Sequence, residues 1–114
     1  MKNFATFTIL GRIARITALN NVTKVTIASN YRRKNKDGAW EDDPHFNEVT
    51  IFDANTRRYI DDHCGKGDLV QVEGRLRQNK FERDGQAVYT VDLVCQDFGK
   101  LASKAEVSEE DGGR

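Results

Sequence analysis

A chain of 114 residues with 38% hydrophobic and 32% charged residues has the length and composition of one soluble globular domain. No apolar run approaches the length that crosses a bilayer, so a cytoplasmic protein with no membrane partner is expected. Cys64 and Cys95 form no CxxC pair, which argues against a disulfide framework or a structural zinc site and favours reduced thiols.

The formal net charge of zero is an average over two unlike parts of the chain. Up to Lys104 there are 17 Lys and Arg residues against 14 Asp and Glu residues, whereas residues 105–114 hold four acids and one Arg. A mildly basic body with an acidic end is compatible with a polyanionic partner. Residues 102–114 are rich in Ser, Glu and Gly and are predicted to form a disordered acidic tail.

Alternation with a period of two predicts five strands, each buried on one face. The expected strands are 7–13, a second one around Val25 and Ile27, 46–52, 68–76 and 88–95. Their expected inward residues are Phe7, Ile9, Gly11, Ile13, Val25, Ile27, Val49, Ile51, Val70, Val72, Gly74, Leu76, Tyr89, Val91, Leu93 and Cys95. Residues 55–64 are spaced as in a helix, which Asp53 or Asn55 would cap and which Gly65 and Gly67 would end.

Five strands with one helix between the third and the fourth is the element order of the OB-fold, an all-β, five-stranded Greek-key barrel. Residues 1–101 are therefore predicted to form one OB-fold domain. The polar segments 31–45 and 77–85 are predicted to be long loops that frame the binding face of the barrel.

Two phenylalanines of the third strand are expected to face solvent. Because Val49 and Ile51 supply the core face of this strand, Phe46 and Phe52 lie on the other face. An exposed aromatic ring has two explanations: it contacts a neighbouring subunit, or it is a platform for unstacked bases.

Both predicted loops combine aromatic rings with cations. Tyr31 is followed by Arg32, Arg33 and Lys34, with Trp40 nearby, and Phe81 lies among Arg77, Lys80 and Arg83. Rings for base stacking beside cations for phosphates is the arrangement that single-strand recognition requires, although each cluster alone is also compatible with a solvated hairpin tip.

Catalytic chemistry has little support in the sequence. His45 and His63 have no partner at metal-ligand spacing, and no Ser, His and Asp set or phosphate-binding glycine loop is present. The sequence therefore predicts a protein that is not an enzyme, with no metal and no cofactor.

Several segments of the chain resemble the bacterial single-stranded-DNA-binding proteins. They are Ile9–Ile13, Thr23–Asn30, Lys66–Arg77, Phe81–Gln86 and Tyr89–Val91. The resemblance implies sequence-tolerant binding and protection of single-stranded DNA in replication, recombination and repair, and a homotetramer. It places the base-stacking rings at Tyr31, Phe46, Phe52 and Phe81. The full set of candidate DNA-binding residues is Arg12, Tyr31, Arg32, Arg33, Lys34, Trp40, Phe46, Phe52, Arg75, Arg77, Lys80 and Phe81.

Two departures from the family pattern bear on partners. Phe46-Asn47 replaces a common Trp-His pair near the subunit contact, which leaves a dimer or a tetramer open. The chain ends in Gly112-Gly113-Arg114 without a terminal aromatic ring, so recruitment of host replication or repair proteins through the C-terminal tip is not expected; the acidic tail is expected to compete with DNA instead. A primosome-type OB protein and an RNA-binding or protein-binding OB domain remain alternatives.

Overall fold

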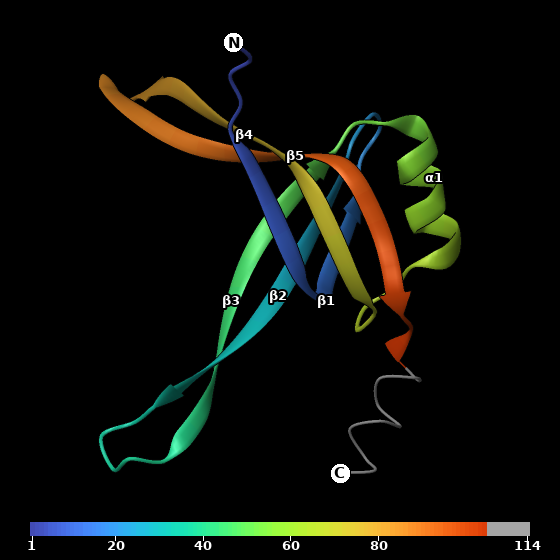
Figure 1. Ribbon diagram of the computed structural model, residues 1–114. Helices are drawn as coiled ribbons and strands as arrows, with labels where there is room; N and C mark the ends of the chain where they lie inside the picture. Colours follow the sequence, from blue (N-terminus) through green and yellow to red (C-terminus); the bar gives the residue numbers. More distant parts are fainter. Residues whose placement is uncertain (105–114) are drawn as a thin grey trace.

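The computed structural model describes residues 1–104, which form five strands and one helix (Figure 1). In chain order these are β1 (Thr6–Ala18), β2 (Thr23–Lys34), β3 (Trp40–Ile51), α1 (Ala54–His63), β4 (Leu69–Arg83) and β5 (Gln86–Ala102). The predicted element order is therefore confirmed, and each observed strand is longer than its predicted counterpart.

The strands close into a barrel in the order β1-β2-β3-β5-β4, with β4 paired to β1. All neighbouring strands are antiparallel except β3 and β5, which run parallel through Val49 opposite Leu93 and Thr50 opposite Val94. The predicted five-stranded barrel with one helix between the third and fourth strands is thus confirmed.

The interior of the barrel is filled by β-branched side chains from four strands and one residue of the helix. Its buried members are Ile9, Ile13, Val25, Ile27, Val49, Ile51, Ile60, Val70 and Val72. Phe7, Leu93 and Cys95 are partly buried and pack against this core. Burial raises the pKa of the Cys95 thiol to about 11, with smaller contributions from the carboxylates of Asp97 and Asp53. Both cysteines are free.

Three residues that were predicted to face the core are exposed instead. Leu76, Tyr89 and Val91 are 40%, 58% and 59% exposed. They belong to parts of β4 and β5 that extend past the barrel, so they alternate correctly but have no interior to enter. The prediction for these three residues is wrong because it assumed that the barrel encloses the whole strand.

The two segments predicted to be long loops are mostly strand. Residues 31–34 of β2 pair with residues 40–43 of β3, and residues 77–83 of β4 pair with residues 86–92 of β5. The true turns are only residues 35–39 and Asp84-Gly85. In Figure 1 both hairpins project from the barrel as twisted two-stranded arms, which we name the β2–β3 ribbon and the β4–β5 ribbon.

Helix α1 begins after Asp53, one of the two predicted caps. The Asp53 carboxylate accepts a hydrogen bond from the backbone N–H of Thr56 at 2.9 Å and another from its hydroxyl at 2.8 Å. These two bonds, with a smaller contribution from Arg57, lower the pKa of Asp53. Ile60 is the buried residue of the helix and places α1 against the end of the barrel. Within residues 1–104 no helix is both long and apolar enough to traverse a bilayer.

Gly74 of β4 lies where β1 and β5 approach β4 closely. It lies opposite Phe7 of β1 and Cys95 of β5, next to a register shift between Glu73 and Gly74. A Cβ atom at this position would lie 1.9 Å from the carbonyl oxygen of Val94 and 2.8 Å from the Phe7 ring. The β1–β4–β5 contact therefore requires a residue without a side chain at position 74.

Candidate nucleic-acid interface

The predicted binding residues fall into three groups, and the first lies on the outer wall of the barrel. Phe46 is 61% exposed and Phe52, directly after β3, is 52% exposed, as predicted. Ala28 of β2 lies opposite both Phe46 on β3 and Arg12 on β1. Residues opposite each other share a face of the sheet, so Arg12 and Phe46 flank a small alanine on one surface. We name Arg12, Phe46 and Phe52 the wall cluster.

The second group lies on the β2–β3 ribbon, where an acidic residue faces each arginine. The Arg33 Nε atom is 3.0 Å from Glu41 Oε1, and the Arg32 Nε atom is 3.7 Å from Asp42 Oδ1. Lys34 Nζ instead lies 5.7 Å from the centre of the Trp40 ring, a cation–π contact. Two of the cations that the sequence clusters together, Arg32 and Arg33, are therefore paired with an acid across the strands.

Tyr31 and Phe46 point to opposite faces of β2 and β3. Tyr31 lies opposite Asp43, which is three residues before Phe46, and side chains alternate along a strand. Tyr31 instead contacts His45 edge to face, with ring centres 5.1 Å apart, and His45 Nε2 lies 3.0 Å from Asp43 Oδ2. Two of the predicted stacking rings, Tyr31 and Phe46, therefore lie on different faces of the strand pair.

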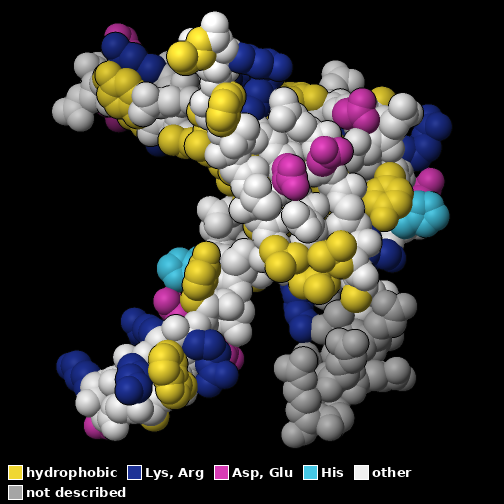
Figure 2. All heavy atoms as spheres, viewed as in Figure 1, with side chains coloured by type: hydrophobic (Ala, Val, Ile, Leu, Met, Phe, Trp, Pro, Cys, Tyr) yellow, Lys and Arg dark blue, Asp and Glu magenta, His cyan; other side chains and the backbone are white. Residues whose placement is uncertain are grey.

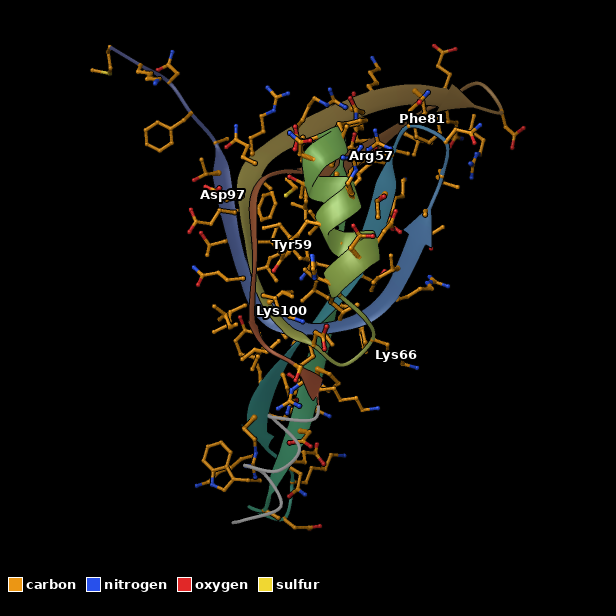
Figure 3. The ribbon with its side chains drawn as sticks, turned by 90° about the vertical axis from the view of Figure 1, so that its right-hand side faces the viewer. Arg57, Tyr59, Lys66, Phe81, Asp97 and Lys100 are labelled. Atoms are coloured by element: carbon orange, nitrogen blue, oxygen red, sulfur yellow. The ribbon has the colours of Figure 1, made fainter. Side chains whose placement is uncertain are left out.

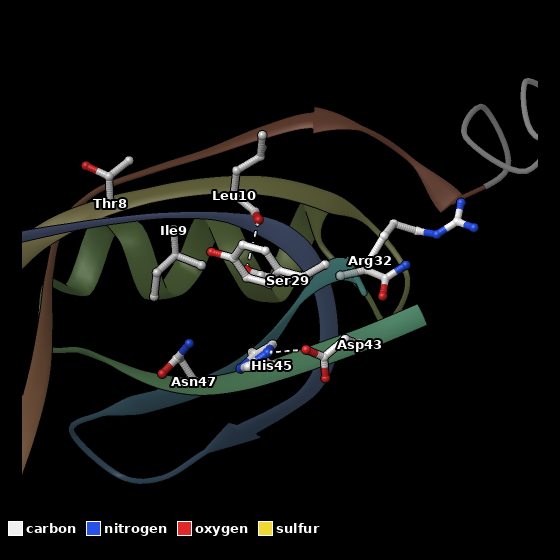
Figure 4. A pocket seen from close by; sticks show the side chains of 10 residues that line it. Thr8, Ile9, Leu10, Ser29, Arg32, Asp43, His45 and Asn47 are labelled. Atoms are coloured by element: carbon white, nitrogen blue, oxygen red, sulfur yellow. Dashed lines mark hydrogen bonds and ion pairs between the residues drawn. The ribbon is translucent and has the colours of Figure 1, made fainter. Parts of the chain in front are cut away.

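A groove of about 850 Å³ lies beside Tyr31, between β1 and the base of the β2–β3 ribbon. Figure 4 shows Asp43, His45 and Asn47 along one side, Thr8 and Leu10 along the other, and Arg32 at one end. The lining combines a guanidinium, a carboxylate, amides, hydroxyls and aromatic rings with aliphatic side chains. Its size and mixed polarity are suited to a nucleotide or to side chains of another subunit.

The third group lies on the β4–β5 ribbon and has a regular arrangement. Arg75, Arg77, Phe81 and Arg83 are separated by even numbers of residues, so they share one face of β4. The Arg83 guanidinium lies 5.7 Å from the centre of the Phe81 ring. Arg77 is 3.3 Å from Asp92. The sequence prediction therefore identified three residues, Arg75, Arg77 and Phe81, that the fold brings to one surface.

Lys80 lies on the opposite face of the same ribbon. Its Nζ atom is 5.9 Å from the centre of the Tyr89 ring, which lies directly opposite on β5. Tyr89 was missed as a site residue because it was predicted to point inward. The Asp84-Gly85 pair was the available signal: a two-residue hairpin turn there pairs Arg83 with Gln86 and, counting back, Lys80 with Tyr89.

Figure 2 shows the two ribbons as arms on either side of a hollow, with Lys and Arg side chains concentrated along both arms and rings among them. No group of His, Cys, Asp or Glu side chains within residues 1–104 has the arrangement to hold a metal ion. The chemistry of the described surface is that of exposed rings beside cations.

A closed five-stranded barrel with a helix between β3 and β4 is an OB-fold, and rings beside cations on its ribbons are features of OB-folds that contact single-stranded nucleic acid. The single-strand binding protein family matches residues 4–101. This chain belongs to that family.

Known proteins agree with this assignment. The chain is 33% identical over 86 residues to "Single-stranded DNA-binding protein 1" of Streptococcus pyogenes, a match that covers 75% of this chain and 63% of that protein. It superposes on a mitochondrial single-stranded DNA binding protein of S. cerevisiae with a TM-score of 0.70 and 28% identity, covering 89% of this chain and 98% of the other.

A Plasmodium falciparum SSB in complex with ssDNA has the same fold, with a TM-score of 0.70 at 21% identity over 89% of this chain and 97% of the other. The chain spans less than two thirds of the length of the curated bacterial relatives it matches. The matched family and these relatives are described as binding proteins rather than as enzymes.

Proposed function

We propose that this protein binds single-stranded DNA with little sequence preference and protects it during replication, recombination and repair. One observation carries the proposal: three exposed rings, Trp40, Phe81 and Tyr89, each lie within 6 Å of a cation on the two ribbons, at 5.7, 5.7 and 5.9 Å. A ring and a cation side by side match the base and the phosphate of one nucleotide, whatever the base.

The bound DNA strand would contact the wall cluster and the candidate residues of both ribbons. Phe46 and Phe52 on the wall and Phe81 on the β4–β5 ribbon stack bases, while Arg75 and Arg77 contact phosphates. Arg12 adds charge to the wall, and Tyr31, Trp40, Arg32, Arg33 and Lys34 contact the strand along the β2–β3 ribbon. Lys80 contacts a phosphate on the opposite face of the β4–β5 ribbon.

A titration of Trp40 fluorescence tests this function. Trp40 is the only tryptophan and lies on the β2–β3 ribbon, so bound DNA changes its environment. We expect oligo-dT to bind much more tightly than duplex DNA at equal salt, because paired bases do not expose their faces to the rings. Affinity should fall with salt, since each neutralised phosphate contributes about −0.7 to the slope of log K against log salt. Equal affinity for duplex DNA would refute the proposal, and tighter binding of single-stranded RNA would favour an RNA-binding OB domain.

We propose further that the protein assembles as a homotetramer. Exposed apolar side chains lie near the base of the β4–β5 ribbon, at Leu76 and Val91, and along the start of the chain, at Phe4 and at Leu10 of β1. Apolar surface of this kind is typical of subunit contacts. Light scattering at micromolar concentration measures the assembly: a tetramer is expected, a dimer would require revision, and a monomer would exclude both.

Residues 1–101 are proposed as the DNA-binding domain, acting in the cytoplasm at the nucleoid. β5 continues to Ala102, and the backbone N–H of Lys104 bonds Asp68 Oδ1 at 3.0 Å. Of the predicted acidic tail, residues 102–114, the part from residue 105 onward lies outside the described residues, and so does the prediction that this tail competes with DNA.

A further inference from the structure

Arg57 lies at the junction of β3 and α1 and contacts the backbone of Phe52, a residue of the wall cluster. Its Nε atom donates a hydrogen bond to the carbonyl oxygen of Phe52 at 3.2 Å, and its backbone N–H bonds the carbonyl oxygen of Asp53 at 2.9 Å. In Figure 3 Arg57 is on the upper half of α1, whereas Lys66 and Lys100 lie near its lower end. The helix therefore holds this guanidinium against the backbone of Phe52.

The charge of Arg57 is not consumed by an ion pair. Within residues 1–104 no carboxylate lies within 4.0 Å of its guanidinium. The nearby Asp53 carboxylate is directed to the Thr56 N–H and hydroxyl as the cap of α1. By contrast, Lys24 on the neighbouring strand lies 3.5 Å from Glu48.

The guanidinium also has donors to spare. The bond to Phe52 uses one of five N–H groups, and it fixes the orientation of the planar fork. The remaining N–H groups match the geometry of a phosphate, and a fork held in place loses less conformational entropy on binding. Lysines at the far end of α1 do not have this position: Lys100 donates to the carbonyl oxygen of His63 at 2.7 Å.

We propose that Arg57 and Phe52 form one nucleotide subsite, in which the Phe52 ring stacks a base and the Arg57 guanidinium binds a phosphate of the same strand. The proposal rests on the single-stranded-DNA-binding function proposed above and extends it to a residue of the helix. It makes α1 part of the DNA-binding surface and continues the wall cluster past the end of β3.

The test compares Arg57→Gln with Arg58→Gln, which removes the same charge from the adjacent exposed residue of α1. Both variants of the full chain are titrated with oligo-dT between 50 and 200 mM salt. We expect Arg57→Gln to bind more weakly and to lower the steepness of log K against log salt by about 0.7, so that its deficit shrinks about 2.6-fold over this range. Arg58→Gln should retain the wild-type steepness.

Four outcomes would overturn the subsite. Arg57→Gln with wild-type affinity excludes a contact, and weaker binding with an unchanged salt dependence makes Arg57 only a positioning residue for Phe52. An equal decrease for Arg58→Gln assigns the effect to overall charge. Arg57→Lys keeps the charge and replaces the Gln variant if that variant does not fold. It should retain the wild-type salt dependence, and a decrease of about 0.7 in the steepness of log K against log salt would also exclude the subsite. Failure of the wild-type protein to bind oligo-dT would refute the proposed function itself, a result distinct from these four.

Discussion

The two ribbons have similar composition and different electrostatic surroundings. Each carries four cations, over residues 31–45 and 75–92 respectively, together with exposed rings. On the β2–β3 ribbon, Arg32 and Arg33 lie opposite Asp42 and Glu41. On the β4–β5 ribbon the arginines share one face of β4 with Phe81, and Arg77 forms an ion pair with Asp92 at 3.3 Å.

This difference shows that the residue across the strand pair decides whether a cation is available to a phosphate. Two clusters that look alike along the chain are therefore expected to contribute unequally to DNA binding. The β4–β5 ribbon should provide more of the affinity. On the β2–β3 ribbon, the acids opposite Arg32 and Arg33 should weaken the attraction of these arginines for phosphates.

The largest expected effect separates the rings of the two ribbons. Stacking on one ring is worth roughly 1–3 kcal/mol, so Phe81→Ala should weaken oligo-dT binding by about 5- to 150-fold. Tyr31→Ala should cost less, because its ring already contacts His45 and lies opposite Asp43. Leu19→Ala, at an exposed position between β1 and β2, is the control for loss of apolar surface. A larger loss for Tyr31→Ala than for Phe81→Ala in the titration would reverse the comparison.

A smaller effect, of opposite sign, should follow from removing the acids of the β2–β3 ribbon. The double variant Glu41→Gln, Asp42→Asn frees Arg33 and Arg32, so binding should tighten and the salt dependence should steepen by up to about 1.4. Asp92→Asn frees only Arg77 on the other ribbon and should steepen it by at most about 0.7.

The control for this change in net charge is Asp62→Asn, Asp97→Asn, which removes two exposed acids outside both ribbons. Titration of all three variants with oligo-dT at several salt concentrations measures the effect. If the control variant tightens binding as much as the β2–β3 ribbon variant, the cross-strand pairs are not what restrains the β2–β3 arginines.

The smallest effect concerns the turn of the β4–β5 ribbon. Gly85 has φ +79° and follows Asp84 at φ +52°. A residue with a side chain is destabilised in this left-handed conformation by roughly 1–2 kcal/mol. Gly85→Ala should therefore raise amide hydrogen exchange at least about fivefold in residues 77–83 and 86–92 and leave the β2–β3 ribbon unchanged. Unchanged exchange in residues 77–83 and 86–92 after the substitution would mean that the turn does not limit local opening.

The barrel was predictable because each of its signals is local. Val25 and Ile27, like Val70 and Val72, alternate with polar residues and are buried, and Asp53 precedes a helix that it caps. The ribbons were not predictable in this way. Residues 31–45 have no buried face, so apolar and polar side chains do not alternate there to indicate a strand. Their pairing register, which sets Arg32 against Asp42 and Lys80 beside Tyr89, is a non-local property.

The candidate site was predictable to a similar extent. The exposure of Phe46 and Phe52 follows from the burial of Val49 and Ile51, so period-two reasoning identified both. The contact of Arg57 with Phe52 joins a helix to the end of a strand, and no spacing rule for strands or loops indicates it.

The close approach at Gly74 affects how substitutions in this region are interpreted. Position 74 directly precedes Arg75, a proposed phosphate contact, and any side chain there would meet the Val94 carbonyl oxygen. A library selected for DNA binding would reject changes at both positions, at one because the barrel no longer closes and at the other because a charge is lost. Gly74 and Arg75 would therefore both fail to tolerate substitution and would seem to form one functional surface. Only Arg75 of the two is proposed to contact DNA. Sorting the variants first by the amount of folded protein would separate the two.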